Sequence, residues 1–256
     1  MNPPYNDRIV AFIDILGFES LIKRLGDDGD LHSKLLWALR RIGHYKEIAG
    51  KPEYAQKELE VSVFSDSIVI SSQPEHIFDV VWSCVGLQSQ LLALAILTRG
   101  GISMGRTYHQ KDILYGDGMI KAYRLESGAA IYPRIIVDPN LMPRVSRGQR
   151  EMYLSEDHDG LWFVDPFAMG ILPACSDDLL EDGWDPHHVA LVELGKHIER
   201  EIAATNEANH QMKWRWLESQ RRNALAYLEK NGSVRIFHRM KLAEQRRSTA
   251  TPDRCA

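Results

Sequence analysis

The stretch VFSDSIVIS joins two strand-type runs, residues 59–64 and 68–71, over a very short span. A connection this short makes neighbouring strands pair antiparallel, as a β-hairpin. The turn lacks the Asn-Gly or Asp-Gly pair that is usual in tight hairpins and instead has Asp66 between two serines. The hairpin therefore commits this part of the chain to an antiparallel sheet, with a carboxylate at its tip.

Helical and strand patterns surround this hairpin in a regular order. An apolar run at residues 8–14 is followed by helical spacing at 18–25 and 31–45, and a long amphipathic pattern covers 75–97. A glycine-bearing strand pattern at 98–109, a turn and helix at 116–127 and a strand at 132–141 complete the series. The order βααββαβ predicts an α+β fold of the ferredoxin-like type, with helices on one face of the sheet and the other face left to be covered.

Beyond about residue 145 the pattern changes. Residues 159–167 form one further strand-type run, and residues 187–232 form a long helical stretch with one or two breaks. The polar end, residues 246–256, has the composition of a flexible tail. We therefore predict a core domain over residues 1–145 and an extension over residues 146–256, a strand followed by helices.

Charge and cysteine content narrow the class of protein. The net charge of −4 creates no field that attracts nucleic acid, so no direct nucleic-acid partner is expected. The chain has no basic-then-apolar signal pattern at its start, and its longest apolar run, LLALAIL, is too short to span a bilayer. Three widely separated cysteines fit a reducing compartment. These features predict a soluble cytoplasmic protein with no membrane partner.

Two aspartates each close an apolar strand run. Asp14 ends the run IVAFID, and in the ferredoxin-like order this strand lies beside the hairpin that carries Asp66. Two carboxylates brought close repel each other unless a cation lies between them, and Mg²⁺ binds carboxylates together with phosphate oxygens. The pair therefore predicts a nucleotide site with two metal ions. The alternatives are a solvated turn residue for Asp66 and a helix N-cap for Asp14.

Two neighbouring features fit a phosphate-bearing substrate. Gly17 lets the backbone pass close to a phosphate, and the amides at the start of the following helix favour an anion. Arg124, on the predicted helix 116–127, could stabilise the charge that builds up on a transferred phosphoryl group. The alternative for Arg124 is a solvated helix residue, with Glu126 or Asp117 as a candidate partner nearby.

Three stretches, AFIDILGF, FSDSIVIS and RGGISMGRTY…LYGDGMIKAYRLES, resemble the catalytic domain of class III nucleotidyl cyclases. The resemblance covers roughly residues 8–137 and implies cyclisation of a nucleoside triphosphate, with release of pyrophosphate. It further implies that Asp14, Asp66 and the backbone carbonyl of Ile15 hold two Mg²⁺ or Mn²⁺ ions. By the same resemblance, Arg124 acts from the partner subunit of a head-to-tail homodimer, with the active sites at the interface.

The chain departs from the purine cyclases at three positions. Ile120 stands where the family has an asparagine that orients the ribose. Ser62 and Ile113 stand at the two base-reading positions, where adenylate cyclases have Lys and Asp and guanylate cyclases have Glu and Cys. A Ser–Ile pair cannot supply the charged hydrogen bonds that either purine enzyme uses. Both purine assignments lose support.

The motifs FIDILGF and FSDS resemble those of the bacterial pyrimidine cyclases of Pycsar anti-phage systems. The cyclic UMP or cyclic CMP that those enzymes make activates a separate effector protein. The resemblance implies UTP or CTP as substrate, with UTP favoured. Ser62, Tyr54 and Arg99 are candidate readers of the base, although an ordinary edge charge is the favoured interpretation of Arg99. The predicted substrate-binding residues are Gly17, Phe18, Ser62, Arg99 and Ile113.

Two other functions remain open from the sequence. The chain could be a cyclase-like sensor that binds a nucleotide without turning it over, and Ile120 in place of asparagine favours this. It could also be a ferredoxin-like interaction module, in which case Asp14 and Asp66 should point apart.

Overall fold

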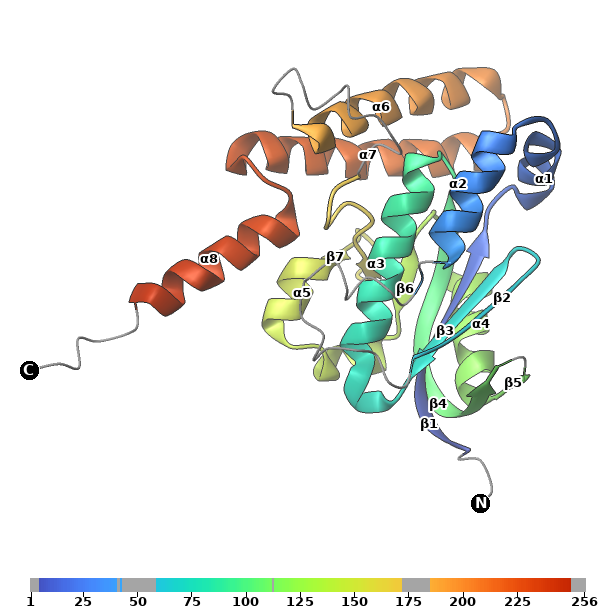
Figure 1. The fold of residues 1–256 in the computed structure, drawn as a ribbon, viewed down its shortest axis with the longest axis vertical. Helices are drawn as coiled ribbons and strands as arrows, with labels where there is room; N and C mark the ends of the chain where they lie inside the picture. Colours follow the sequence, from blue (N-terminus) through green and yellow to red (C-terminus); the bar gives the residue numbers. More distant parts are fainter. Residues whose placement is uncertain (1–4, 41, 43–58, 112, 172–184, 250–256) are drawn as a thin grey trace, which may run out of the picture.

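The computed structural model describes residues 5–40, 42, 59–111, 113–171 and 185–249. Within these ranges the strands form one sheet in the order β2-β3-β1-β4-β6-β8-β7, and β5 pairs with β4 (Figure 1). The strands are β1 (Asn6–Ile15), β2 (Glu60–Phe64), β3 (Ser67–Ser72), β4 (Thr98–Gln110), β5 (Ile113–Gly116), β6 (Ile135–Val137), β7 (Leu154–Glu156) and β8 (Trp162–Val164).

The helices follow the predicted order as far as β6, but one of them, Arg147–Tyr153, was not predicted and, with β7, precedes the predicted strand of the extension. The helices are α1 (Phe18–Asp27), α2 (Gly29–Arg40), α3 (Ile77–Ala93), α4 (Asp117–Ala129), α5 (Arg147–Tyr153), α6 (Pro186–Ala204), α7 (Ala208–Asn231) and α8 (Arg235–Thr249), with short 3₁₀ helices at η3 (Pro74–His76) and η4 (Pro139–Arg144). None of the helices within the described ranges combines the length and the apolar character needed to cross a bilayer.

The α+β class and the ferredoxin-like order of the core are confirmed. Strand β1 lies between β3 and β4 and is antiparallel to both, and β2 pairs with β3 through the predicted hairpin. Strand β6 then adds to β4 in parallel, after the α4 crossover. The N-terminal strand is therefore central, because hairpin β2–β3 covers one of its edges and β4 covers the other.

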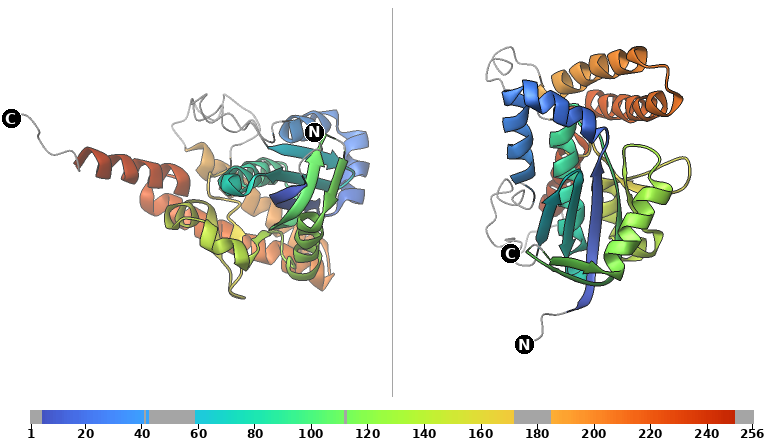
Figure 2. Two further views of the ribbon diagram at one scale, coloured as in Figure 1. Left: turned by 90° about the horizontal axis from the view of Figure 1, so that it is seen from below. Right: turned by 90° about the vertical axis from the view of Figure 1, so that its right-hand side faces the viewer.

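Helices pack on both faces of this sheet, which corrects the prediction that they lie on one face. Side chains of β1 alternate between the faces: Ile9 and Ile13 join the core beneath α1, α2 and α3, whereas Val10 and Phe12 pack with Ala122 of α4. Figure 2 shows α4 on the opposite side of the strands from α1, α2 and α3.

Two glycines of β4 explain how α4 reaches the second face. A Cβ atom on Gly101 would lie 2.5 Å from the carbonyl oxygen of Ala122, and one on Gly105 would lie 2.7 Å from the amide nitrogen of Gly118. Because both distances are far below van der Waals contact, only residues without a side chain allow the helix backbone to lie directly on the strand. The glycines thus allow the backbone of α4 to lie directly against β4 at Gly118 and Ala122.

The sheet continues past residue 145. The predicted strand within residues 159–167 is confirmed as β8, which pairs with β6 and with β7. Val145, Tyr153 and Val164 belong to the same buried cluster as the side chains of β1. The sheet and the core both continue across residue 145 without interruption. The domain boundary at this residue therefore stays a prediction.

The C-terminal helices show how far the predicted helical stretch extends. Helices α6 and α7 lie side by side, and their break at residues 205–207 matches the predicted interruption (Figure 1). Helix α8 runs to Thr249 and so includes the first residues of the segment 246–256 that was predicted to be a flexible tail. Residues 250–256 lie outside the described residues.

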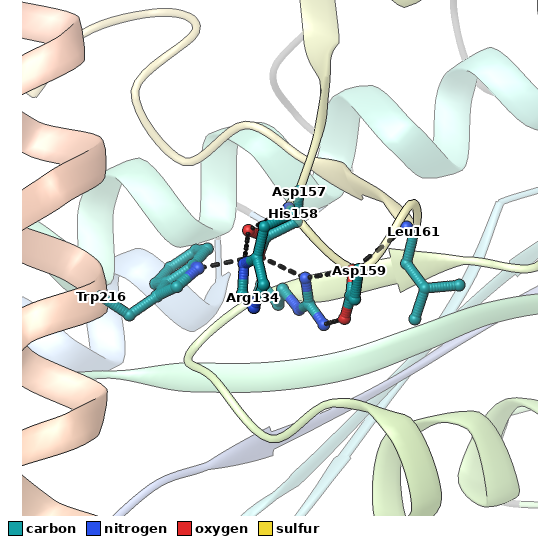
Figure 3. A network of polar contacts seen from close by, with 6 residues as sticks. All are labelled: Arg134, Asp157, His158, Asp159, Leu161 and Trp216. Carbon is teal, nitrogen blue, oxygen red and sulfur yellow. Dashed lines mark hydrogen bonds and ion pairs between the residues drawn. The ribbon is translucent and has the colours of Figure 1, made fainter.

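A buried ion-pair network fastens α7 to the sheet (Figure 3). The guanidinium of Arg134, whose side chain has no exposed surface, pairs with the carboxylates of Asp157 and Asp159 in the connection between β7 and β8. The indole nitrogen of Trp216 on α7 donates to the same Asp157 carboxylate at 2.8 Å. The network therefore links the turn before β6, the β7–β8 connection and α7.

Candidate active site

The structure brings Asp14 and Asp66 to one hollow. The register pairs Asp14 of β1 with Ser67 of β3, and the amide of Ile15 donates to the carbonyl oxygen of Asp66 at 2.8 Å. The end of β1 is thus tied directly to the hairpin tip. Both aspartates line a hollow of about 630 Å³ together with three further predicted residues, Ile15, Gly17 and Phe18.

The hairpin tip that carries Asp66 is conformationally unusual. Ser65 and Asp66 form the two-residue turn between β2 and β3, and Ser65 has a φ of +53°. A residue other than glycine in this region costs on the order of 1–3 kcal/mol and persists only where its surroundings hold it. Here the strand pairing on both sides and the Ile15 hydrogen bond hold it. The half-buried Asp66 is therefore placed by fixed backbone on three strands.

The start of α1 forms another wall of the hollow. Gly17 adopts a left-handed conformation, with φ of +70°, and is the N-cap of α1, which begins at Phe18. Asp14 is therefore a strand residue and not the N-cap that the sequence left open as an alternative. Because the first amides of a helix have no partner within it, the N-terminus of α1 presents hydrogen-bond donors and a positive dipole end to the hollow.

The electrostatics of Asp14 favour a cation in this hollow. Burial raises the pKa of Asp14, the nearby Arg99 guanidinium opposes this rise, and the negative charge of Asp66 adds to it. The two carboxylates are therefore close enough to repel each other. Within the described residues no group of three or more His, Cys, Asp or Glu side chains is arranged as a metal cage. A pair of carboxylates with open space beside it suits Mg²⁺ or Mn²⁺, which take further ligands from phosphate and water.

Glu126 belongs to this site, although sequence reasoning assigned it no functional role. Its side chain is 3% exposed, and its Oε1 lies 2.5 Å from Nε of Arg99. The same Arg99 nitrogen lies 3.4 Å from Oδ2 of Asp14. Burial raises the pKa of Glu126, Arg99 opposes the rise and Asp14 adds to it. The only sequence signal for Glu126 was its place in the motif RLES. The motif does not show that Glu126 pairs with Arg99.

The alternative that the sequence left open, a solvated Arg124, agrees with its exposure, but the two partners suggested for it are both engaged elsewhere. Glu126 pairs with Arg99, and Asp117 pairs with Lys121 at 2.6 Å. Arg124 is exposed and has no hydrogen-bond or ion-pair partner among the described residues. Since successive helix residues are about 100° apart, Arg124 points roughly 200° around α4 from the inward-facing Glu126. Arg124 therefore does not face the hollow of its own chain.

The predicted base-reading residues form a second group. The Ser62 hydroxyl lies 2.9 Å from Nε2 of His109 and donates to the carbonyl oxygen of Lys111 at 3.1 Å. Ile113, at the start of β5, follows shortly after Lys111 and is 58% exposed. The Ser62 side chain thus bonds to the end of β4, shortly before Ile113 in the sequence. Arg99 lies apart from them, against Asp14, and Tyr54 lies outside the described residues.

No protein-family model matches the sequence, and no curated protein is similar to it. Solved structures of cyclases show a distant likeness. A bacterial light-regulated adenylyl cyclase matches 65% of this chain and 54% of its own, with 17% identity and a TM-score of 0.41. The guanylyl cyclase Cya2 matches 64% of this chain and 94% of its own, with 14% identity and a TM-score of 0.35. The adenylyl cyclase CyaB from P. aeruginosa matches 62% and 93%, with 15% identity and a TM-score of 0.35.

This chain therefore spans about half the length of the first of these structures. At such identities the likeness concerns the fold alone.

Proposed function

We propose that this protein is a pyrimidine nucleotide cyclase that converts UTP to 3′,5′-cyclic UMP and pyrophosphate. The observation that carries the proposal is the pair of repelling carboxylates, Asp14 and Asp66, in one hollow at the N-terminus of α1. In this reaction the ribose 3′-oxygen bonds to the α-phosphorus, the bond from that phosphorus to pyrophosphate breaks, and the hydroxyl proton is released. Negative charge grows on the phosphates, so the site must supply positive charge and hydrogen-bond donors.

Different residues of the hollow are assigned to metal binding and to phosphate binding in this reaction. The carboxylates of Asp14 and Asp66 and the carbonyl of Ile15 would hold two Mg²⁺ or Mn²⁺ ions. Bound there, such ions lower the pKa of a hydroxyl and neutralise phosphate charge. The amides that follow Gly17, from Phe18 onward, orient phosphate oxygens at the start of α1.

Arg99 is assigned to the charged end of the substrate. It lies between Asp14 and the buried Glu126, and its contact with Glu126 is much the shorter of the two. Glu126 therefore holds the guanidinium beside the hollow, whether or not Asp14 is occupied with a cation. This position suits a contact with phosphate, which guanidinium groups bind well, better than contact with the base.

A homodimer would complete the site. Arg124 faces away from its own hollow, and the same helix and both hairpins expose large apolar side chains. These are Val63, Phe64, Ile113, Tyr115, Ile120 and Tyr123. These side chains are available to a partner chain, and contiguous apolar surfaces are typical of interfaces. A second copy placed there would cover the surface and receive Arg124 opposite its own carboxylates.

Two alternatives depend on particular observations. Ser62 and Ile113 do not by themselves separate UTP from CTP, so a cytidylate cyclase that makes cyclic CMP remains the nearest alternative. Ile120 leaves the ribose without the family's asparagine and favours a sensor that binds a nucleotide without turnover. The interaction module requires Asp14 and Asp66 to point apart, and their common hollow and mutual repulsion count against it. The resemblance to the Pycsar pyrimidine cyclases further implies that the product acts on a separate effector protein in anti-phage defence.

Product analysis with all four ribonucleoside triphosphates tests the proposal. The purified protein is incubated with Mn²⁺ and each triphosphate, and the products are identified by mass spectrometry. We expect cyclic UMP and pyrophosphate from UTP, with little product from ATP or GTP. Cyclic CMP as the main product would establish the cytidylate alternative. Tight nucleotide binding without any product would establish the sensor and contradict a cyclase.

Mixing two inactive variants tests whether each site takes residues from both chains. Arg124→Ala is expected to lower turnover about 10²–10³-fold without changing stability, because it removes one charged stabiliser of the transition state from an exposed position. When equal amounts of Arg124→Ala and Asp66→Asn chains are mixed and allowed to exchange, about half of the dimers are mixed, and each of those has one intact site. Activity should therefore recover to about a quarter of wild type. No recovery, despite exchange demonstrated by native mass spectrometry, would contradict a shared site.

A further inference from the structure

A chain of hydrogen bonds crosses four strands beneath Ser62. Nε of Arg8 on β1 donates to Oγ of Ser71 on β3 at 2.9 Å, and this oxygen lies 2.8 Å from Nδ1 of His109 on β4. Nε2 of His109 lies 2.9 Å from Oγ of Ser62 on β2, and the Ser62 hydroxyl donates to the Lys111 carbonyl. His109 is 4% exposed, so the middle of the chain is buried, whereas the bond from Ser62 to Lys111 at its end is exposed.

The two ends of this chain determine the direction of every hydrogen bond in it. A guanidinium only donates and a carbonyl oxygen only accepts. Since Ser62 gives its single proton to Lys111, it must accept from Nε2 of His109. A neutral imidazole with its proton on Nε2 accepts at Nδ1, and this is satisfied by the proton of Ser71, which itself accepts from Arg8.

The imidazole is neutral near pH 7. Burial, and then the positive charge of Arg8, lower the pKa of His109 to about 4. A protonated ring would also have two donors, and Ser71 would then have an unused proton beside the Arg8 guanidinium. The neutral Nε2–H form is therefore the tautomer that satisfies all these groups.

We propose that His109 is a positioning residue that makes the Ser62 hydroxyl a pure hydrogen-bond acceptor toward the substrate base. With its proton on Lys111 and one lone pair on His109, the half-buried Ser62 oxygen has one acceptor site left. The site should therefore select a base edge that offers an N–H group there, which in uracil is N3–H. Ile113, the other predicted base-reading residue, offers no polar group. This inference rests on the proposed function, because it takes Ser62 to face the base.

His109 also joins the two hairpins that carry the predicted base-reading positions. It belongs to β4 just before the β4–β5 turn, and its partner Ser62 belongs to the β2–β3 hairpin. Without the imidazole, the Ser62 hydroxyl could rotate and donate its proton to a substrate, and the hairpins would lose a side-chain link. Loss of His109 should therefore change the choice of base as well as the affinity.

The tautomer is tested directly by ¹⁵N nuclear magnetic resonance of the full-length protein. We expect His109 to show a protonated Nε2 and an unprotonated, hydrogen-bonded Nδ1 at pH 7. A proton on Nδ1, or a charged ring at that pH, would overturn the proposal. This measurement needs no nucleotide, so its result does not depend on whether the protein is a cyclase.

Base recognition is tested with UTP and 3-deaza-UTP, in which C–H replaces N3–H of uracil. The measured quantity is the ratio of the dissociation constants of 3-deaza-UTP and UTP. For wild type this ratio should be about ten, which corresponds to the loss of one neutral hydrogen bond. For Ser62→Ala and for His109→Phe the ratio should fall toward one. Ser33→Ala, an exposed serine with a similar hydroxyl-to-carbonyl bond on α2, should keep the wild-type ratio.

A second variant covers the case in which His109→Phe does not fold, as judged by thermal unfolding. Ser71→Ala removes the proton donor to Nδ1 and should also lower the ratio, while Ser62 and His109 stay in place. An unchanged ratio in Ser62→Ala would overturn the inference. Normal UTP binding without cyclic product would overturn the proposed function alone, because the binding ratio can still be measured.

Discussion

Asp66→Asn is expected to abolish cyclisation, with a loss of roughly a thousandfold or more in kcat, because several kcal/mol of charge stabilisation by bound ions depends on that carboxylate. The asparagine is nearly the same size and keeps the backbone carbonyl that accepts from Ile15. It also removes the repulsion with Asp14, which adds to the rise that burial causes in the pKa of Asp14. The variant should therefore fold at least as stably as wild type, as expected where a site is strained for function.

Three measurements separate loss of chemistry from loss of fold. Initial rates with UTP and Mn²⁺ give the activity, thermal unfolding gives the stability, and unfolding with added Mn²⁺ reports metal binding, since a ligand of the folded state raises the unfolding temperature. We expect Mn²⁺ to raise this temperature in wild type and much less in Asp66→Asn. Asp30→Asn, an exposed aspartate on α2 paired with Lys34, should leave the rate and the Mn²⁺ response unchanged. Substantial activity in Asp66→Asn would exclude the proposed site.

Arg134→Met is expected to destabilise the fold by about 3–5 kcal/mol, because removing one partner of a buried ion pair leaves a buried charge without compensation. The Arg134 side chain has no exposed surface, and the Asp157 side chain is 6% exposed. Methionine would fill much of the volume beside Tyr132 and Phe163, which the guanidinium now contacts. The loss would therefore come mainly from the stranded Asp157 carboxylate and not from a cavity.

The way in which the stability loss of Arg134→Met depends on pH shows whether the unpaired Asp157 carboxylate causes it. Hydrogen bonding to Arg134 lowers the pKa of Asp159. Although burial opposes it, hydrogen bonds from His158 and Trp216 and the Arg134 charge lower the pKa of Asp157. Carboxyl groups with lowered pKa stabilise the fold above their unfolded pKa of about 4, and this stability is lost as the pH falls below that value.

In Arg134→Met, protonation of the unpaired Asp157 should instead stabilise the fold. Urea unfolding should therefore show a difference between wild type and variant that is largest near pH 7 and narrows toward pH 4. Arg144→Met, which replaces an exposed arginine in η4, should change stability by less than about 0.5 kcal/mol at any of these pH values. A difference between wild type and Arg134→Met that did not change with pH would point to packing in place of charge.

Local patterns were enough to predict most of the core. The βααββαβ order follows from periodicity and turn signals, because the hydrophobic period of a strand differs from that of a helix. The sequence also predicts that the hairpin tip lies beside the end of the first strand, since antiparallel neighbours place their ends side by side. For that reason Asp14 and Asp66 were expected to approach each other, and both line one hollow, together with Ile15, Gly17 and Phe18.

The sequence by itself determined the order of the elements and the acidic pair, because both depend on residues close together in the chain or on adjacent strands. Tertiary structure alone decided which face α4 covers, which partner Arg99 takes and which side chains bond to His109. The face depends on backbone contact at Gly101 and Gly105. The other two depend on side chains from strands and helices far apart in the chain, and no local periodicity records such contacts.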